Sequence, residues 1–297
     1  MRRLFLFTCS LVAALPLWPV AAASPLSRTA SAIIPLNYAL APGMPILKHS
    51  ALQRFFTYNF GPGQSYTDVL AVINLSRKAP LKVTLRVSDG STPHLGAGIV
   101  FNSPGRQRAI GRWIQLGRSA VTVPPYSITF VPITIHIPSS MQPGEYRGAI
   151  DAINEQGMTA TQGNVHSTIH GDVRCLIYLR VNGHATAGLH ILQVAMDPAS
   201  RHRRLNVTLQ NPGTVIDYSI TGTMTFVGSR GTYTMPALVG DITAGDSTTV
   251  TFDVGRTIPP GRYKATIRMT YVVALSYRAP MQRRSTSWHG TVAVPTS

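Results

Sequence analysis

The chain of 297 residues carries 27 Lys and Arg against 11 Asp and Glu, which gives a formal net charge of +16. The length is enough for two domains of ordinary size, and so positive a chain is attracted to polyanions. Of its two cysteines, Cys9 lies in the N-terminal apolar run and Cys175 lies in VRCLIYLRV. Cys9 should be removed with the N-terminal apolar run, so we expect no internal disulfide in the mature chain, and packed cores must stabilise the fold.

The first 23 residues predict an export signal. Two arginines open the chain, an apolar run extends from Leu4 to Val20, and Ala21–Ala23 offer a small-residue cleavage site. A retained membrane anchor is the alternative, but Pro16 and Pro19 lie late in this run. No later apolar run approaches the roughly 18 to 20 residues that span a bilayer. We expect an exported protein, periplasmic or at the cell surface, with no transmembrane span in its mature chain.

Residues 24–46 are rich in Pro, Ala and Ser and predict an extended leader, with room for one strand. After the leader, Val, Ile, Thr and Tyr dominate, and the 22 prolines and 25 glycines of the chain interrupt them at short intervals. This composition is typical of many short strands joined by turns. The sequence therefore predicts an all-β protein.

A strand, a turn and a second strand occur twice in the chain, 117 residues apart. Apolar and polar residues alternate over 131–137 and again over 248–254. PGEYRGAI (143–150) follows the first of these strands and PGRYKATI (260–267) follows the second. Proline and glycine suit the two central positions of a type II turn. The repeat predicts one sandwich domain that is used twice.

A tyrosine stands two residues after the glycine in both copies, at Tyr146 and Tyr263. This spacing is typical of the tyrosine corner of immunoglobulin-like sandwiches, in which the hydroxyl bonds back to upstream backbone. The alternative is that a half-buried strand often begins with tyrosine. We predict two tandem immunoglobulin-like β-sandwich domains, 47–182 and 183–297, with a boundary near Asn182. Cys175 is expected to be a small buried hydrophobe in the first of them.

A series of short elements runs through the chain from about residue 45 to 270. These are Arg54–Phe56, Pro62–Gly63, Asn74, GRWIQL at 111–116, Pro124, Ile137–Pro138 and PGEYRGAI, followed by VRCLIYLRVNG, VTLQNPG and PGRYKATI. Their order resembles that of the WxL-interacting proteins, which are bacterial cell-surface proteins. The resemblance implies a peptidoglycan-binding first domain and a second immunoglobulin-like domain that binds a partner protein. Members usually end in a transmembrane helix with a basic tail, whereas this chain ends in VAVPTS.

The sequence contains no recognisable catalytic or metal-binding motif. The only glutamates are Glu145 and Glu155, and no pair of acids stands out for a hydrolase. Four histidines near Cys175 in sequence form a zinc-compatible set, but neither HExxH nor a paired-cysteine pattern is present. We predict a protein that is not an enzyme, with no catalytic residue, no metal site and no cofactor.

Trp113, Arg112 and Tyr66 are the candidate binding residues. An exposed indole beside an arginine suits contact with a sugar or a protein, because the ring stacks on apolar faces while the guanidinium attracts anions. The alternative, which we favour for Trp113, is that the indole fills the first core.

Two functions remain open. The first is a non-catalytic adaptor of the cell envelope that binds a cell-wall polymer, such as peptidoglycan or another anionic glycan, and an envelope protein. The second is a periplasmic pilus-type chaperone that donates a strand, for which VPITIHI (131–137) is a candidate, and holds a basic anchor between its domains. The cations are scattered along the sequence, so we expect a diffuse basic surface and no nucleic-acid partner.

Overall fold

A computed structural model describes most of the chain after its N-terminal segment. The described ranges are 37–48, 53–101, 107–154, 156–162, 165–169, 171–198, 203–255, 257–276 and 279–296. The predicted signal peptide and most of the predicted leader lie outside them. No helix within these ranges is long and apolar enough to cross a membrane.

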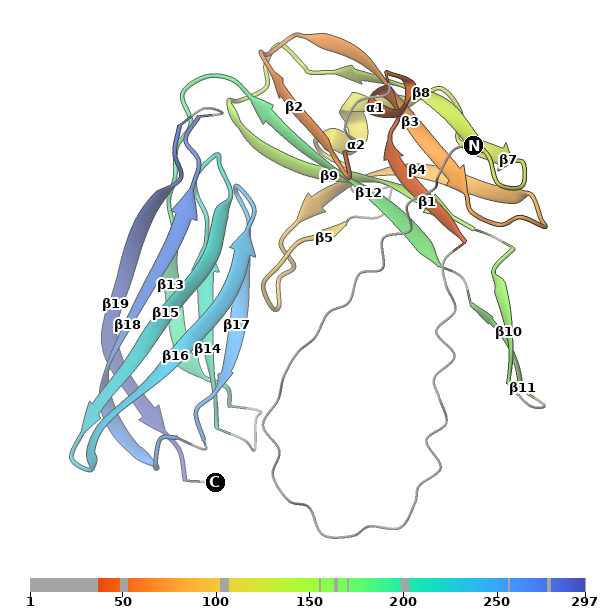
Figure 1. Cartoon of the computed structure of the whole chain (residues 1–297). Coiled ribbons are helices and arrows are strands. Elements are labelled where there is room, and N and C mark those ends of the chain that lie inside the picture. The colour runs from red at the N-terminus through yellow and green to blue at the C-terminus, as the bar shows by residue number, and fades with distance from the viewer. Residues whose placement is uncertain are drawn as a thin grey trace. The chain divides into compact units, whose positions relative to one another are not determined.

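The first sandwich has two sheets (Figure 1). One sheet has the strand order β1 (Tyr38–Pro42), β3 (Ser65–Asn74), β8 (Ile128–His136) and β6 (Ile114–Leu116). The other has the order β2 (Phe56–Phe60), β12 (Asp172–Val181), β9 (Gly144–Ile153), β4 (Leu81–Ser91) and β5 (Val100–Phe101), and β7 (Ala120–Val123) also pairs with β4. Two short helices, α1 (Gly43–Leu47) and α2 (Ile110–Trp113), lie between strands. A separate hairpin, β10 (Met158–Gln162) with β11 (Val165–Ile169), connects β9 to β12.

The second sandwich also has two sheets. The smaller has the order β13 (His190–Met196), β14 (Arg204–Gln210) and β17 (Ser247–Asp253). The larger has the order β16 (Gly231–Ile242), β15 (Asp217–Gly228), β18 (Gly261–Val273) and β19 (Gln282–Val294). The prediction of an all-β chain with two immunoglobulin-like sandwiches is confirmed.

Each sandwich has its own hydrophobic core. The first core takes buried side chains from Tyr38 to Val181, and the second takes them from Leu189 to Val294. The position of the domain boundary near Asn182 stays a prediction. The leader does contain a strand, because β1 pairs with β3 and places Tyr38 in the first core. The first core therefore begins ahead of residue 47.

The alternating patterns build these cores as expected. In β8, Val131, Ile133 and Ile135 are fully buried, whereas the residues between them are exposed. In β17, Thr248 and Phe252 are buried, and the polar Thr251 and Asp253 are exposed. A strand with one apolar face packs that face against the opposite sheet.

The tyrosine corner is present in both sandwiches. The Tyr146 hydroxyl donates to the carbonyl oxygen of Gln142, and the Tyr263 hydroxyl donates to that of Pro259, both at 2.8 Å. A buried asparagine is repeated too: the side-chain oxygens of Asn74 and Asn211 each accept a hydrogen bond from the backbone N–H two residues later, at 2.9 Å. The two domains thus share specific internal hydrogen bonds as well as a fold.

The predicted type II turns are wrong at both Pro-Gly pairs. Gly144 has no positive φ, and φ of Gly261 is 156°, far from the value of about 80° that a type II turn requires. Gly144 is instead required by a close approach, since a Cβ there would lie 2.2 Å from the carbonyl oxygen of Thr214.

The loop between β4 and β5 contacts the second sandwich. Leu95 forms an isolated parallel bridge with Thr249 of β17. The Thr249 N–H donates to the carbonyl of His94, and the Gly96 N–H donates to the carbonyl of Thr249, both at 2.9 Å. Backbone hydrogen bonds of this kind add a short strand to the edge of β17.

Candidate functional site

One face of β9 and β12 carries three cross-strand pairs of complementary side chains. The pairs are Asp151 with Arg174, Arg147 with Tyr178, and Glu145 with Arg180. Residues directly opposite each other in an antiparallel pair of strands have side chains close enough to interact. The Arg147 guanidinium carbon lies 3.6 Å from the centre of the Tyr178 ring, which is a cation–π contact.

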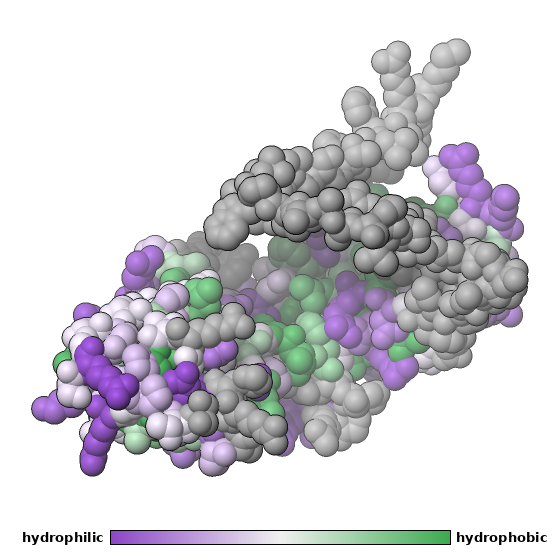
Figure 2. Space-filling model, turned by 90° about the horizontal axis from the view of Figure 1, so that it is seen from below, coloured by the Kyte–Doolittle hydropathy of each residue, from purple (hydrophilic) through white to green (hydrophobic). Residues whose placement is uncertain are grey.

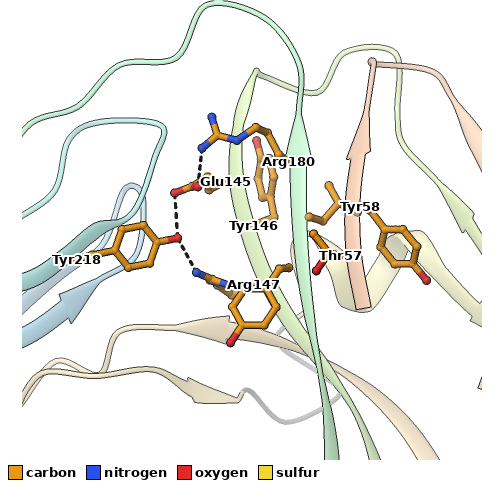
Figure 3. A pocket seen from close by; sticks show the side chains of 9 residues that line it. Thr57, Tyr58, Glu145, Tyr146, Arg147, Arg180 and Tyr218 are labelled. Atoms are coloured by element: carbon orange, nitrogen blue, oxygen red, sulfur yellow. Dashed lines mark hydrogen bonds and ion pairs between the residues drawn. The ribbon is translucent and has the colours of Figure 1, made fainter. Parts of the chain in front are cut away.

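Glu145 is the centre of a polar cluster (Figure 3). Its Oε1 accepts a hydrogen bond from Arg180 Nη2 at 2.5 Å, and its Oε2 accepts from the Ile216 N–H at 3.0 Å and the Tyr218 hydroxyl at 3.2 Å. Arg180 Nη2 also donates to the carbonyl of Ala274 at 2.6 Å. The ion pair is shielded from water, with side chains 9% and 14% exposed. Residues of both sandwiches thus share one buried network.

Tyr218 connects this ion pair to Arg147. Its hydroxyl oxygen accepts a hydrogen bond from Arg147 Nη2 at 2.5 Å and donates to Glu145. Burial, and then the negative charge of Glu145, raise the pKa of Tyr218 above its usual range. The phenol therefore stays protonated and keeps its role as a donor.

Arg147 retains hydrogen-bonding capacity. Its Nε and Nη1 atoms are buried, and neither has a hydrogen-bond partner among the residues that the structure describes. The residue lines a small pocket together with Thr57, Tyr58 and Arg180 (Figure 3). An arginine fork with free N–H groups is suited to a planar anion such as a carboxylate.

The edge of β12 is open over half of its length. All ten residues of β12 pair with β9, but only Ile177–Val181 pair with β2 on the other side. No described strand pairs with Asp172–Leu176 on that side. The hairpin strand β11, which precedes this stretch, pairs only with β10. An edge with unsatisfied backbone groups is a template for strand addition.

The proposed donor strand at 131–137 is a wrong prediction. β8 lies between β3 and β6, and its apolar side chains fill the first core. The pattern alone cannot distinguish an internal strand from an edge strand, because both bury one face.

The three candidate binding residues lie on different elements. Trp113 of α2 is only 6% exposed and packs edge-on against Tyr146 at 4.8 Å, which is the core position we favoured. Arg112 is exposed in the same helical turn. Tyr66 of β3 is 45% exposed, and its ring contacts those of Tyr58 and Phe60. No ring contact between Tyr66 and Trp113 exists in the described part, and a binding role for these residues stays a prediction.

Cys175 is fully buried in the first core, as predicted. Burial raises the pKa of its thiol to about 12, so the reactive thiolate is not populated at neutral pH. Among the described residues, no group of three or more His, Cys, Asp or Glu side chains is placed to hold a metal ion.

The polar cluster around Glu145 has no signature in the local sequence. Glu145, Arg180 and Tyr218 lie far apart in the chain and meet only through the fold. One signal was present, since the position of Glu145 in the repeat is taken by Arg262 in the second copy. An acid that the repeated turn does not need is a candidate for a separate role.

No protein-family model and no curated protein matches the sequence. Among solved structures, a chain in the chaperone–tip adhesin complex of CFA/I fimbriae is 11% identical, with a TM-score of 0.43 over 85% of this chain and 98% of that one. The class 5 fimbriae chaperone CfaA is 10% identical, with a TM-score of 0.41 over 79% and 96%. A chain in the complex of Salmonella enterica SafA pilin with the SafB chaperone is 10% identical, with a TM-score of 0.40 over 85% and 98%. Similarity at this level adds no argument about what this chain does.

Proposed function

We propose that this chain is an exported, non-catalytic protein that donates the open edge of β12 to an envelope protein with an incomplete sheet. This is the mode of action of a pilus-type chaperone. The observation that carries the proposal is the open edge at Asp172–Leu176, directly after the β11 hairpin strand. A partner strand on this edge gains backbone hydrogen bonds for affinity, and side-chain pockets give specificity.

The composition of β12 supports this choice of edge. Val173, Cys175 and Ile177 alternate on its inner face, and the open stretch carries the charged residues Asp172 and Arg174. β19, at the edge of a sheet in the second sandwich, instead begins with Gln282, Arg283 and Arg284. Charged residues protect an edge from strand addition, and on β12 Asp172 and Arg174 have opposite signs, whereas the charges that begin β19 are both positive.

Arg147 and Arg180 supply the basic anchor that this function needs. Both line the pocket at the end of β12 away from the open edge. Arg180 is held by Glu145 and Ala274, whereas Arg147 has two buried N–H groups without partners in the described part of the chain. A carboxylate of the bound protein would pair with the Arg147 guanidinium through one of these N–H groups, because Nε–H and Nη1–H lie on different edges of its plane.

Peptidoglycan binding by the first domain, which the resemblance to the WxL-interacting proteins implies, has less support. The indole that would stack on a sugar is the buried Trp113. The resemblance itself stays a prediction.

The test is co-purification under native conditions from the envelope of the source cell, with purified cell wall as the competing ligand. We expect an envelope protein to co-purify, and purified cell wall not to displace it. In the complex, amide hydrogen exchange over 165–176 should slow, because those N–H groups become bonded. Leu176→Pro should reduce co-purification, since proline removes a backbone donor and hinders strand pairing.

Asn59→Pro is the matched control, because Asn59 is an exposed residue of β2, the edge strand of the same sheet. Thermal unfolding establishes that both variants fold. The proposal is wrong if exchange over 165–176 does not change in the complex, if Asn59→Pro alone abolishes co-purification, or if the chain sediments with cell wall and no protein co-purifies.

A further inference from the structure

The outer face of the larger sheet in the second sandwich has an unusual composition. Its outward side chains on β15, β18 and β19 include eight hydroxyls, four cations and one histidine, which we name the hydroxyl face; the apolar Val227, Val272 and Ala293 lie on the same side at its margins. The members are Thr221, Thr223 and Thr225 of β15, Arg262, Lys264, Thr266, Arg268 and Thr270 of β18, and Arg283, Ser285, Ser287, His289 and Thr291 of β19. None of them is buried.

Strand alternation places these residues on one side of the sheet. The intervening residues of β18, such as Ala265, Ile267 and Met269, are buried in the second core. The pairing registers then align the outward side chains in rows. The rows are Thr221, Thr270 and Ser285; Thr223, Arg268 and Ser287; and Thr225, Thr266 and His289. In a β-sheet, the backbones of paired residues on adjacent strands lie about 4.8 Å apart, and residues i and i+2 of one strand lie about 6.8 Å apart.

Negative charge is absent from this face. The sequence from residue 254 to 297 contains no Asp or Glu. In β15 and β16, Asp217 is buried and Asp241 accepts a hydrogen bond from the Ser219 N–H. Neither Lys264 nor Arg268 forms an ion pair with any residue in the described ranges. The exposed cations of this face are therefore available to an external anion.

A shallow hollow marks the middle of the face. It is lined by Thr266, Arg268, Ser285, Thr286, Ser287 and His289. Thr266 Oγ1 lies 3.1 Å from His289 Nδ1, so these two side chains hold each other in place. A guanidinium surrounded by hydroxyl groups matches an anionic oxygen that has neutral hydroxyls beside it.

We propose that the hydroxyl face binds an anionic polysaccharide, with carboxylate or phosphate groups at the cations and sugar hydroxyls at the serine and threonine rows. Single-stranded nucleic acid is disfavoured, because the face has no aromatic residue on which bases could stack. A membrane surface is disfavoured, because Val227 and Leu238 are the large exposed apolar side chains on this side of the sheet and two such residues are too few to anchor it in lipid. Figure 2 shows the second sandwich at the left, where pale and purple surface prevails over green. This site is separate from the edge of β12.

The test measures binding of the full chain to alginate, a polyuronate, with neutral dextran, DNA and anionic lipid vesicles as comparison probes. We expect alginate to bind and salt to weaken the binding, because screening reduces the attraction between exposed charges. The double variant Lys264→Thr/Arg268→Ser should weaken alginate binding about tenfold or more.

Lys82→Thr/Arg118→Ser is the charge-matched control, since both residues are exposed on the first sandwich. It should change the alginate affinity less than about twofold. Thr223→Val, which keeps both charge and shape, should weaken binding a few fold by removing a hydroxyl. Equal losses in the two double variants would show a diffuse charge effect and overturn the proposal. The absence of alginate binding would also overturn the proposal, as would equally tight binding of dextran. A complex with DNA or vesicles that is tighter than that with alginate, and that Lys264→Thr/Arg268→Ser weakens, would overturn it too.

Discussion

Both sandwiches contain the same Pro-Gly-x-Tyr turn, but the third residue of the turn makes different contacts in the two. In both, the residues Pro-Gly-x-Tyr lead into a strand, and the tyrosine hydroxyl bonds to the carbonyl oxygen four residues earlier at 2.8 Å. The third residue of the turn is Glu145 in the first copy and Arg262 in the second. Glu145 is bound by Arg180, Ile216 and Tyr218, whereas Arg262 is exposed. The hydrogen bond of the tyrosine thus stabilises each domain internally, whereas the third residue of the turn is available for contacts outside its own domain.

The two domains also differ in how they satisfy buried acids. In the first sandwich, Asp89 accepts hydrogen bonds from backbone N–H groups, and Asp151 is bound by Ser88 and Arg174. In the second, both oxygens of the fully buried Asp217 have no partner among the described residues. A charged carboxylate in that position is unfavourable, because burial removes its hydration.

The largest effect is expected from Asp217. Burial raises its pKa to about 8, against about 3.9 for an unfolded chain, so the folded state binds the proton more tightly. Stability is then fully present below about pH 4 and is lost as the pH rises toward and through about 8. Asp217→Asn should remove this slope and stabilise the protein by a few kcal/mol at pH 8. Urea unfolding at a series of pH values from 4 to 9 measures the free energy of unfolding. If Asp217→Asn keeps the same dependence on pH as the wild type, Asp217 is not its cause.

Removal of Glu145 should have the next largest effect. Glu145→Ala leaves the buried Arg180 without its anionic partner, and we expect a loss of about 2 kcal/mol in the free energy of unfolding. Arg262→Ala, at the equivalent position of the second copy, should change it by less than about 0.5 kcal/mol. Urea denaturation at neutral pH compares the two variants. Equal losses of stability in the two variants would show that Glu145 and Arg262 contribute equally, which contradicts the prediction.

The tyrosine corners should give the smallest effect. Tyr146→Phe and Tyr263→Phe each remove one hydroxyl donor and keep the ring, so each should cost about 1 kcal/mol. Similar values would support a shared role for the two tyrosines. A loss in only one variant, in the same denaturation experiment, would show that the second hydrogen bond contributes nothing.

The sequence was sufficient for features that repeat or alternate locally. The sandwich fold, the tyrosine corners and the burial of Cys175 follow from short patterns, because strands bury every second residue and the two copies reinforce each other. The burial of Trp113, which lies in α2, was favoured only from the usual burial of tryptophan. Features that depend on pairing partners were missed. Whether 131–137 is an edge or an internal strand depends on β6, a strand of three residues that arrives from elsewhere in the chain.

The same limit applies to both proposed sites. Glu145, Arg180 and Tyr218 come from three separate strands, so no local spacing predicts their contact. The cations of the hydroxyl face also look scattered when read along the chain. Only the registers between β15, β18 and β19 bring Arg268 beside Ser287 and Thr223. A search for consecutive basic residues therefore cannot detect cations that come together across the strands of a sheet.

The bridge between Leu95 and Thr249 bears on self-association. β17 is the last strand of its sheet, and the carbonyl of His94 and the N–H of Gly96 occupy backbone groups that another molecule could otherwise engage. Edge strands with free backbone groups can pair with another molecule, so covering one edge removes one route to self-association. The loop of the first sandwich thus covers the edge of β17 at Thr249, whereas no described strand covers Asp172–Leu176 of β12 on the side away from β9.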